Sequence, residues 1–129
     1  MIKSTKKESP APDTAKRRQP VCWSQEAHAQ SLRVELNDEK FFVFPYIHFM
    51  FAKLECSKEG DVLTMSFATH DIRIAGKNLR EVGVAAQKLS VDWVREATVR
   101  YAALMPVDAV LIERIEVKEA YDADKEPVD

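Results

Sequence analysis

The stretch FFVFPYIHFMF, residues 41–51, constrains the fold of this chain more than any other. It contains six aromatic residues, Phe41, Phe42, Phe44, Tyr46, Phe49 and Phe51. Neighbouring side chains of a strand point to opposite faces, so this run places aromatic side chains on both faces of a sheet. Pro45 interrupts the run, because proline cannot donate a hydrogen bond to a strand ladder. We expect strands on both sides of Pro45, with one face against a core and the other in need of cover.

Alternating apolar and polar residues predict further strands. In SLRVEL, Leu32, Val34 and Leu36 share one face, and the turn-rich NDEK segment joins SLRVEL to FFVF in a hairpin. The segments IHFMFAKLEC, VLTMSF and HDIRIA follow with the same period of two. AVLIERIEV, residues 109–117, is expected to be a closing strand. Together these segments predict an antiparallel sheet of about five strands.

The apolar period becomes helical beyond Gly76. Its apolar positions follow the spacing of one helix face: Leu79, Val82, Ala85, Ala86 and Leu89. Residues 91–105 fit either a second helix ended by Pro106 or a strand in VDWVRE, and we favour the helix because of ATVRYAALM. The predicted fold class is α+β, with an antiparallel sheet of about five strands and one or two helices packed on one face.

The two ends of the chain differ from its body in composition. Residues 1–20 contain three prolines, no aromatic residue, and six Lys and Arg against two acidic residues. Such a segment cannot bury enough apolar surface to offset the entropy cost of ordering. We predict a disordered basic tail over residues 1–27, a single α+β domain over 28–118, and an acidic tail over 119–129. About 90 residues can form one hydrophobic core.

Composition and charge narrow the class of protein. A net charge of -2 and a 46% hydrophobic content are typical of a globular domain and exclude a polycation. The longest apolar run, 11 residues, is short of the ~20 that a membrane-spanning helix needs, so no membrane partner is expected. Cys22 and Cys56 do not form a closely spaced pair, which favours reduced thiols and a cytoplasmic location.

The segment IAGKNL superficially resembles a phosphate-binding loop. A Walker A motif needs Gly where Asp71 stands and Ser or Thr where Asn78 stands, so the motif fails. We expect instead that Gly76 bends the chain at positive φ and that Asn78 caps the following helix, with Glu81 as its capping-box partner. A weaker interpretation retains an anion site at Gly76, Lys77 and Asn78.

Catalytic and metal-binding patterns are weak. His70 and Asp71 are neighbours in a predicted strand, so their side chains point to opposite faces and cannot form a dyad. His28, His48 and His70 lack the spacing of zinc sites, and no serine or cysteine lies in a nucleophile motif. We predict no catalytic residue, no metal and no cofactor. A small enzyme or ligand-binding domain that uses His48 and His70 is the weakest interpretation.

The preferred function is a non-enzymatic binding or assembly module that associates with itself, or with another protein, through its aromatic-rich sheet. The predicted interface comprises Phe41, Phe42, Phe44, Tyr46, Phe49, Phe51 and Trp93. The ends of the same chain could instead cover these residues within a monomer. The alternative function is a nucleic-acid accessory protein whose basic arm contacts phosphates while sheet aromatics stack on bases. Its contact residues would be Lys6, Lys7, Lys16, Arg17 and Arg18.

Overall fold

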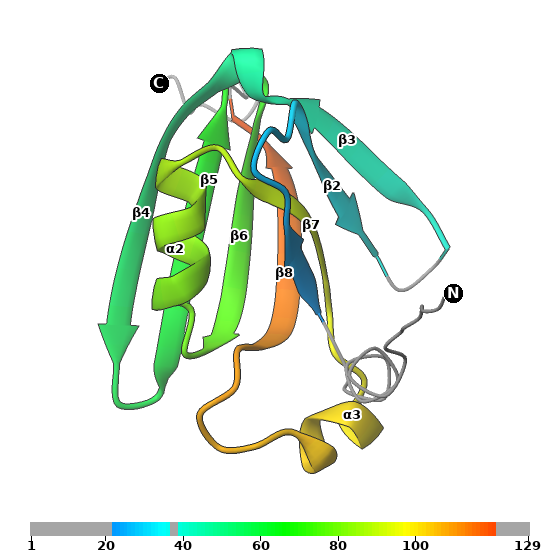
Figure 1. Ribbon diagram of the computed structural model, residues 1–129, viewed down its shortest axis with the longest axis vertical. Coiled ribbons are helices and arrows are strands. Elements are labelled where there is room, and N and C mark those ends of the chain that lie inside the picture. The colour runs from blue at the N-terminus through cyan, green and yellow to red at the C-terminus, as the bar shows by residue number, and fades with distance from the viewer. Residues whose placement is uncertain (1–21, 37–38, 121–129) are drawn as a thin grey trace, which may run out of the picture.

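The computed structural model describes residues 22–36 and 39–120, and Figure 1 shows their arrangement. The elements in chain order are the strands and helices β1 (Trp23–Gln25), β2 (Ser31–Glu35), β3 (Phe41–Pro45), the 3-10 helix η2 (Tyr46–His48), β4 (Phe49–Ser57), β5 (Gly60–Phe67), β6 (His70–Lys77), α2 (Arg80–Gln87), β7 (Val91–Arg95), α3 (Val99–Leu104) and β8 (Leu111–Glu119). Among these residues, no helix has the length and apolarity needed to cross a membrane.

The strands form two four-stranded sheets, and the prediction of one sheet of about five strands is wrong. The first sheet has the order β1-β7-β2-β3 and the second has the order β4-β5-β6-β8. The break falls at Pro45 and η2. The Tyr46 N–H still donates to the Gln30 carbonyl at 2.9 Å, but beyond η2 the chain pairs with β5. The mixed α+β class is confirmed.

The two sheets and α2 enclose one hydrophobic core (Figure 1). The predicted alternation is confirmed in β2, β5 and β6, whose inward residues are buried: Leu32, Val34, Leu63, Met65, Phe67, Ile72 and Ile74. In β4 no residue is buried, so the alternation predicted there does not give a buried face. The helical period is confirmed at the positions of α2 that face the same core: Leu79, Val82, Ala85 and Ala86. Leu89 follows the helix with a φ of 53° and is exposed. Local sequence period therefore identifies the core residues of β2, β5, β6 and α2.

Residues 91–105 contain a strand followed by a short helix, so the helix that we favoured for the whole segment is wrong. β7 pairs antiparallel with β1 and parallel with β2. Val91 and Val94 are fully buried there, and such burial suits β-branched side chains. The chain becomes helical only after Thr98, whose side chain accepts the Tyr101 N–H at 3.1 Å. No residue of α3 is buried.

The folded body begins before residue 28, because β1 lies within the predicted N-terminal tail. Cys22 is buried, and Trp23 packs against the core. The Arg95 N–H donates to the Cys22 carbonyl at 2.8 Å, which fixes this end of the chain to β7. Residues 1–21 of the predicted basic tail, and residues 121–129 of the acidic tail, lie outside the described residues.

Gly76 has a different role from the predicted bend. It lies inside β6 opposite Ile112, at a shift in the β6–β8 register. A Cβ added to Gly76 would lie only 1.9 Å from the Leu111 carbonyl oxygen, so close approach of two backbones requires glycine here. The positive φ, 60°, belongs instead to Asn78.

Asn78 does not cap α2, and the predicted capping box is wrong. Its side-chain amide donates to the carbonyls of Val107 and Ala109, at 3.1 and 2.9 Å. The Leu79 N–H at the helix start instead donates to the Asp61 carboxylate at 3.0 Å. The acceptor at the start of α2 therefore comes from β5, so the sequence around the helix start could not reveal it.

Candidate interaction surfaces

Four of the predicted interface aromatics contribute to the core. Phe44 and Tyr46 are each 6% exposed, and Phe42 and Phe49 are partly buried against the same core. The ring of Phe67 is central to this group, with centroid distances of 5.2 Å to Phe44, 5.3 Å to Phe49 and 5.9 Å to Tyr46. The Tyr46 hydroxyl also donates to the Val91 carbonyl at 2.6 Å. These rings join the two sheets within one protein chain.

The other three predicted interface aromatics lie on two separate surfaces. Phe41 in β3 is 59% exposed and Phe51 in β4 is 54% exposed, and these strands belong to different sheets. Trp93 in β7 is partly buried and belongs to the same sheet as Phe41. Sequence reasoning grouped all of these aromatics into one surface, but the fold offers two candidates.

The first candidate surface is the free edge of β4. This strand has nine residues and pairs only with β5. The opposite edge of the same sheet, β8, is covered, since the Ile115 N–H donates to the Glu96 carboxylate and the Ala97 N–H donates to the Ile112 carbonyl, both at 2.8 Å. In the first sheet, β1 has three residues and β3 ends at Pro45. Within the described residues, β4 is therefore the long uncovered edge.

The register of the β4–β5 hairpin determines which groups point out from this edge. Ser57 pairs with Gly60 across a two-residue loop, so these two residues form a hydrogen-bonded pair. Hydrogen-bonded and non-hydrogen-bonded pairs alternate along an antiparallel ladder. The backbone N–H and C=O groups of Ala52, Leu54 and Cys56 therefore point away from β5.

A shallow apolar groove of about 200 Å³ lies between this edge and α2. Its lining consists of Ala52, Leu54, Leu63, Arg80, Gly83, Val84 and Gln87. Val84 is 46% exposed although it is apolar. Unpaired backbone groups and exposed apolar side chains thus occur together, a combination that fits an added strand.

The second candidate surface is the outer face of the first sheet, which we call the aromatic–arginine face. We define it by Arg33, Glu35, Phe41, Val43, Trp93 and Arg95. The ladder places Arg33 between Val43 and Trp93, and places Glu35 between Phe41 and Arg95. The face therefore combines residues of the β2–β3 hairpin with residues of β7, which is distant from them in sequence.

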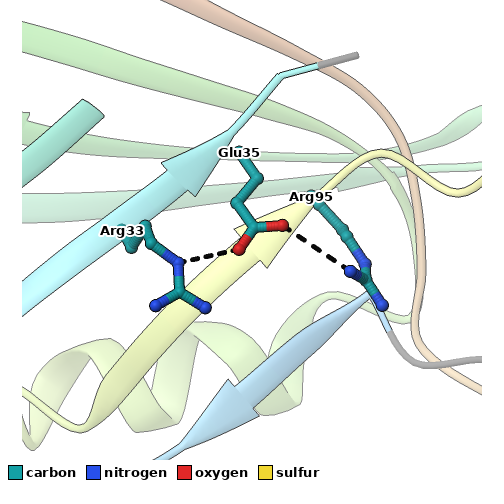
Figure 2. Close-up of polar contacts among 3 residues, drawn as sticks. All are labelled: Arg33, Glu35 and Arg95. Carbon is teal, nitrogen blue, oxygen red and sulfur yellow. Dashed lines mark hydrogen bonds and ion pairs between the residues drawn. The ribbon is translucent and has the colours of Figure 1, made fainter. Parts of the chain in front are cut away.

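Glu35 bridges the two arginines of this face, as Figure 2 shows. Its carboxylate accepts from Arg33 Nε at 2.7 Å and lies 3.6 Å from Arg95 Nη1. The Arg33 guanidinium lies 6.0 Å from the ring centroids of both Phe41 and Trp93, and the Arg95 guanidinium lies 4.8 Å from the Trp93 centroid. Cation–π contacts and one shared carboxylate therefore hold both arginines close to aromatic rings.

The histidines and cysteines are distributed over separate environments. His48 is exposed, whereas His70 is partly buried beside Phe44, with a ring nitrogen 2.8 Å from Thr69 Oγ1. Burial raises the pKa of Cys22, so its thiol stays protonated near neutral pH. Within the described residues, no group of three or more His, Cys, Asp or Glu is arranged to hold a metal.

The predicted anion site and nucleic-acid contacts stay predictions. Lys77 and Asn78 are exposed, but Gly76 is buried in the β6–β8 ladder and the Asp61 carboxylate already accepts the Leu79 N–H. The predicted nucleic-acid contacts all lie outside the described residues: Lys6, Lys7, Lys16, Arg17 and Arg18.

Comparisons of the chain with protein-family models, with curated proteins and with solved structures found no match.

Proposed function

We propose that this protein is a non-enzymatic assembly module that forms a two-fold dimer by pairing the β4 edges of two copies. The observation that carries the proposal is the self-complementary sequence of this uncovered edge. Two copies paired in this way form one continuous antiparallel sheet of eight strands. A closed two-fold contact uses the same surface on both copies and leaves neither β4 edge open.

The register of the dimer follows from the free backbone groups. Ala52, Leu54 and Cys56 point their N–H and C=O groups outward, so they must pair with one another across the two-fold axis. Pairing Leu54 with Leu54 of the second copy also pairs Ala52 with Cys56 in both directions. Each of these three residue pairs can exchange two backbone hydrogen bonds.

Charge selects this register over its neighbours. With Leu54 on the axis, Lys53 lies directly opposite Glu55 of the second copy, and Glu55 lies opposite Lys53. Moving the axis to Lys53 places two lysines opposite each other, and moving it to Glu55 places two glutamates opposite each other. Directly opposed like charges are destabilising, whereas opposite charges contribute about 0.2–1 kcal/mol per pair.

The groove beside α2 adds apolar area to the same contact. Leu54 and Ala52 lie on the face of β4 that is turned toward α2, and Val84 of α2 is exposed beside them. An added strand covers these side chains, and each Å² of apolar surface removed from water contributes about 25 cal/mol. Backbone pairing and apolar burial therefore favour the same partner position.

Charge reversal tests the proposed register. Lys53 and Glu55 are both exposed, so neither reversal should disturb the fold of the monomer. Lys53→Glu creates two pairs of facing glutamates across the dimer axis, and Glu55→Lys creates two pairs of facing lysines. Each substitution should weaken the free energy of dimerisation by about 1–2 kcal/mol, which raises the dissociation constant about five- to thirty-fold. The double variant K53E/E55K restores opposite charges and should restore the dimer.

Size-exclusion chromatography with light scattering over a dilution series gives the measurement. We expect a dimer for the original protein and the double variant, and a shift toward monomer for both single variants. A monomer at all concentrations for the original protein contradicts self-assembly. A dimer that none of these substitutions weakens contradicts the β4 contact and assigns self-association to another surface.

A further inference from the structure

We propose that the aromatic–arginine face is a binding site for single-stranded nucleic acid. The inference is independent of the β4 dimer, since the two surfaces belong to different sheets. The ligand chemistry consists of unpaired bases, which offer flat π faces, joined by a phosphate backbone. The face offers a matching partner for each of these groups.

Aromatic rings on this face can stack with bases. Phe41 is 59% exposed on the edge strand β3, and Trp93 lies on the other side of β2. Base stacking on aromatic side chains tolerates any sequence, because every base has a π face. Val43, also exposed, extends the apolar surface next to Phe41.

The two arginines provide positive charge between and beside these rings. Arg33 lies between Phe41 and Trp93, and Arg95 lies over Trp93. Glu35 binds Arg33 through Nε, and Figure 2 shows the terminal nitrogens of Arg33 directed away from that carboxylate. A guanidinium whose terminal nitrogens point away from its carboxylate partner matches the oxygens of a phosphate.

Cys22, the first of the described residues, lies next to this face. The Cys22 carbonyl accepts the backbone N–H of Arg95, so the chain before Cys22 starts beside a residue of the face. In the sequence, Arg17 and Arg18 stand five and four residues before Cys22. Residues 1–20 contain six basic and two acidic residues, so the test includes a variant of this segment.

The charge distribution favours single strands over duplexes. Acidic residues outnumber basic ones among the described residues, so this part of the chain has a net negative charge, which disfavours tracking of a duplex backbone. A duplex also keeps its bases stacked on each other and away from protein rings. Unpaired bases are available to Phe41 and Trp93, and stacking supplies affinity that does not depend on charge.

Fluorescence anisotropy with the full chain tests the site. The probes are fluorescein-labelled dT12 and U12, with a dA12·dT12 duplex and a glutamate-rich peptide as competitors. Phe41→Ala and Trp93→Ala should each weaken single-strand binding by about 5- to 150-fold. Tyr101→Ala and Arg100→Gln remove the same kinds of side chain from exposed positions on α3 and should change nothing. K16Q/R17Q/R18Q should weaken binding and reduce its salt dependence.

A second readout detects stacking directly. In a Trp23→Phe background, dT12 should quench the fluorescence of Trp93, and circular dichroism checks that each variant is folded. Quenching together with the Phe41→Ala loss supports the proposal even if Trp93→Ala is unstable. The proposal is overturned by an absence of single-strand binding at low salt, or by binding that only the arm variant weakens. Equal affinity for the duplex, or preference for the acidic peptide, also overturns it.

Discussion

Substitution of Gly76 by alanine gives the most direct test of how the second sheet is built. The added Cβ would lie 1.9 Å from the Leu111 carbonyl oxygen and 3.1 Å from the Ile112 Cα. Both atoms belong to the backbone of β8, which β6 holds along its whole length, so no flexible side chain can move to make room. The β6–β8 ladder must open locally instead.

The cost follows from what this opening disrupts. Losing two backbone hydrogen bonds costs about 1–3 kcal/mol, and disturbing the fully buried Ile112 adds a packing loss of about 1–3 kcal/mol. We expect Gly76→Ala to lower the free energy of unfolding by roughly 2–6 kcal/mol. Gly83→Ala is the matched control. Its Cβ would meet Leu63 Cδ1 at 3.7 Å and Leu54 Cδ2 at 3.9 Å, which are ordinary contacts, and alanine favours a helix over glycine by about 0.8–1 kcal/mol.

Urea unfolding followed by tryptophan fluorescence measures both variants. The midpoint should fall for Gly76→Ala and rise slightly for Gly83→Ala, with the same slope in urea. A Gly76→Ala protein within about 1 kcal/mol of the original would refute the reasoning. It would mean that β8 moves away from Gly76 at little cost, so that the close approach of the two backbones does not require glycine.

Two further predictions concern polar contacts of the core and the sheet edge. Burial raises the pKa of Tyr46, so the folded state keeps the phenol proton that the unfolded chain releases above about pH 10. The free energy of unfolding should therefore fall by up to about 1.4 kcal/mol per pH unit above that pH. Tyr46→Phe should remove this contribution to the pH dependence, as measured by denaturation curves at alkaline pH. Glu96→Ala leaves the Ile115 N–H without its acceptor and should lower the free energy of unfolding by about 1–3 kcal/mol, measured by thermal unfolding. Glu113 is exposed on β8, the strand of Ile115, and Glu113→Ala should be nearly neutral.

The parts of the fold that follow from local period could be predicted from the sequence. The β2–β3 hairpin, the strands β4, β5 and β6, and helix α2 all depend on alternation or helical spacing within one short segment. The division into two sheets could not be predicted in this way. It depends on the parallel pairing of β2 with β7, whose residues are about 60 positions apart. VDWVRE, considered alone, fits a helix as readily as a strand.

The candidate surfaces were predictable to a smaller extent. Alternation within FFVF already separates Phe41 from Phe42 and Phe44, and the structure places these residues on opposite faces of β3. The position of Arg33 between Phe41 and Trp93 required the β2–β7 pairing. One signal was available from the sequence: Arg33 and Glu35 share a face of the predicted strand SLRVEL, so their side chains lie on the same side of the sheet. The complementarity of Lys53 and Glu55 becomes visible only when β4 is known to be an edge.

The two proposed contacts can form at the same time, because they use different surfaces of the protein. β4 and β3 lie at opposite sides of the molecule in Figure 1, so a dimer through β4 leaves both aromatic–arginine faces uncovered at its far ends. A long single strand can then contact both faces, and its second contact is intramolecular with an effective concentration near the millimolar range. A short oligonucleotide reaches only one face and gains nothing from the dimer. The dimer would therefore bind long single strands more tightly than short ones, although the chemistry of each site is unchanged.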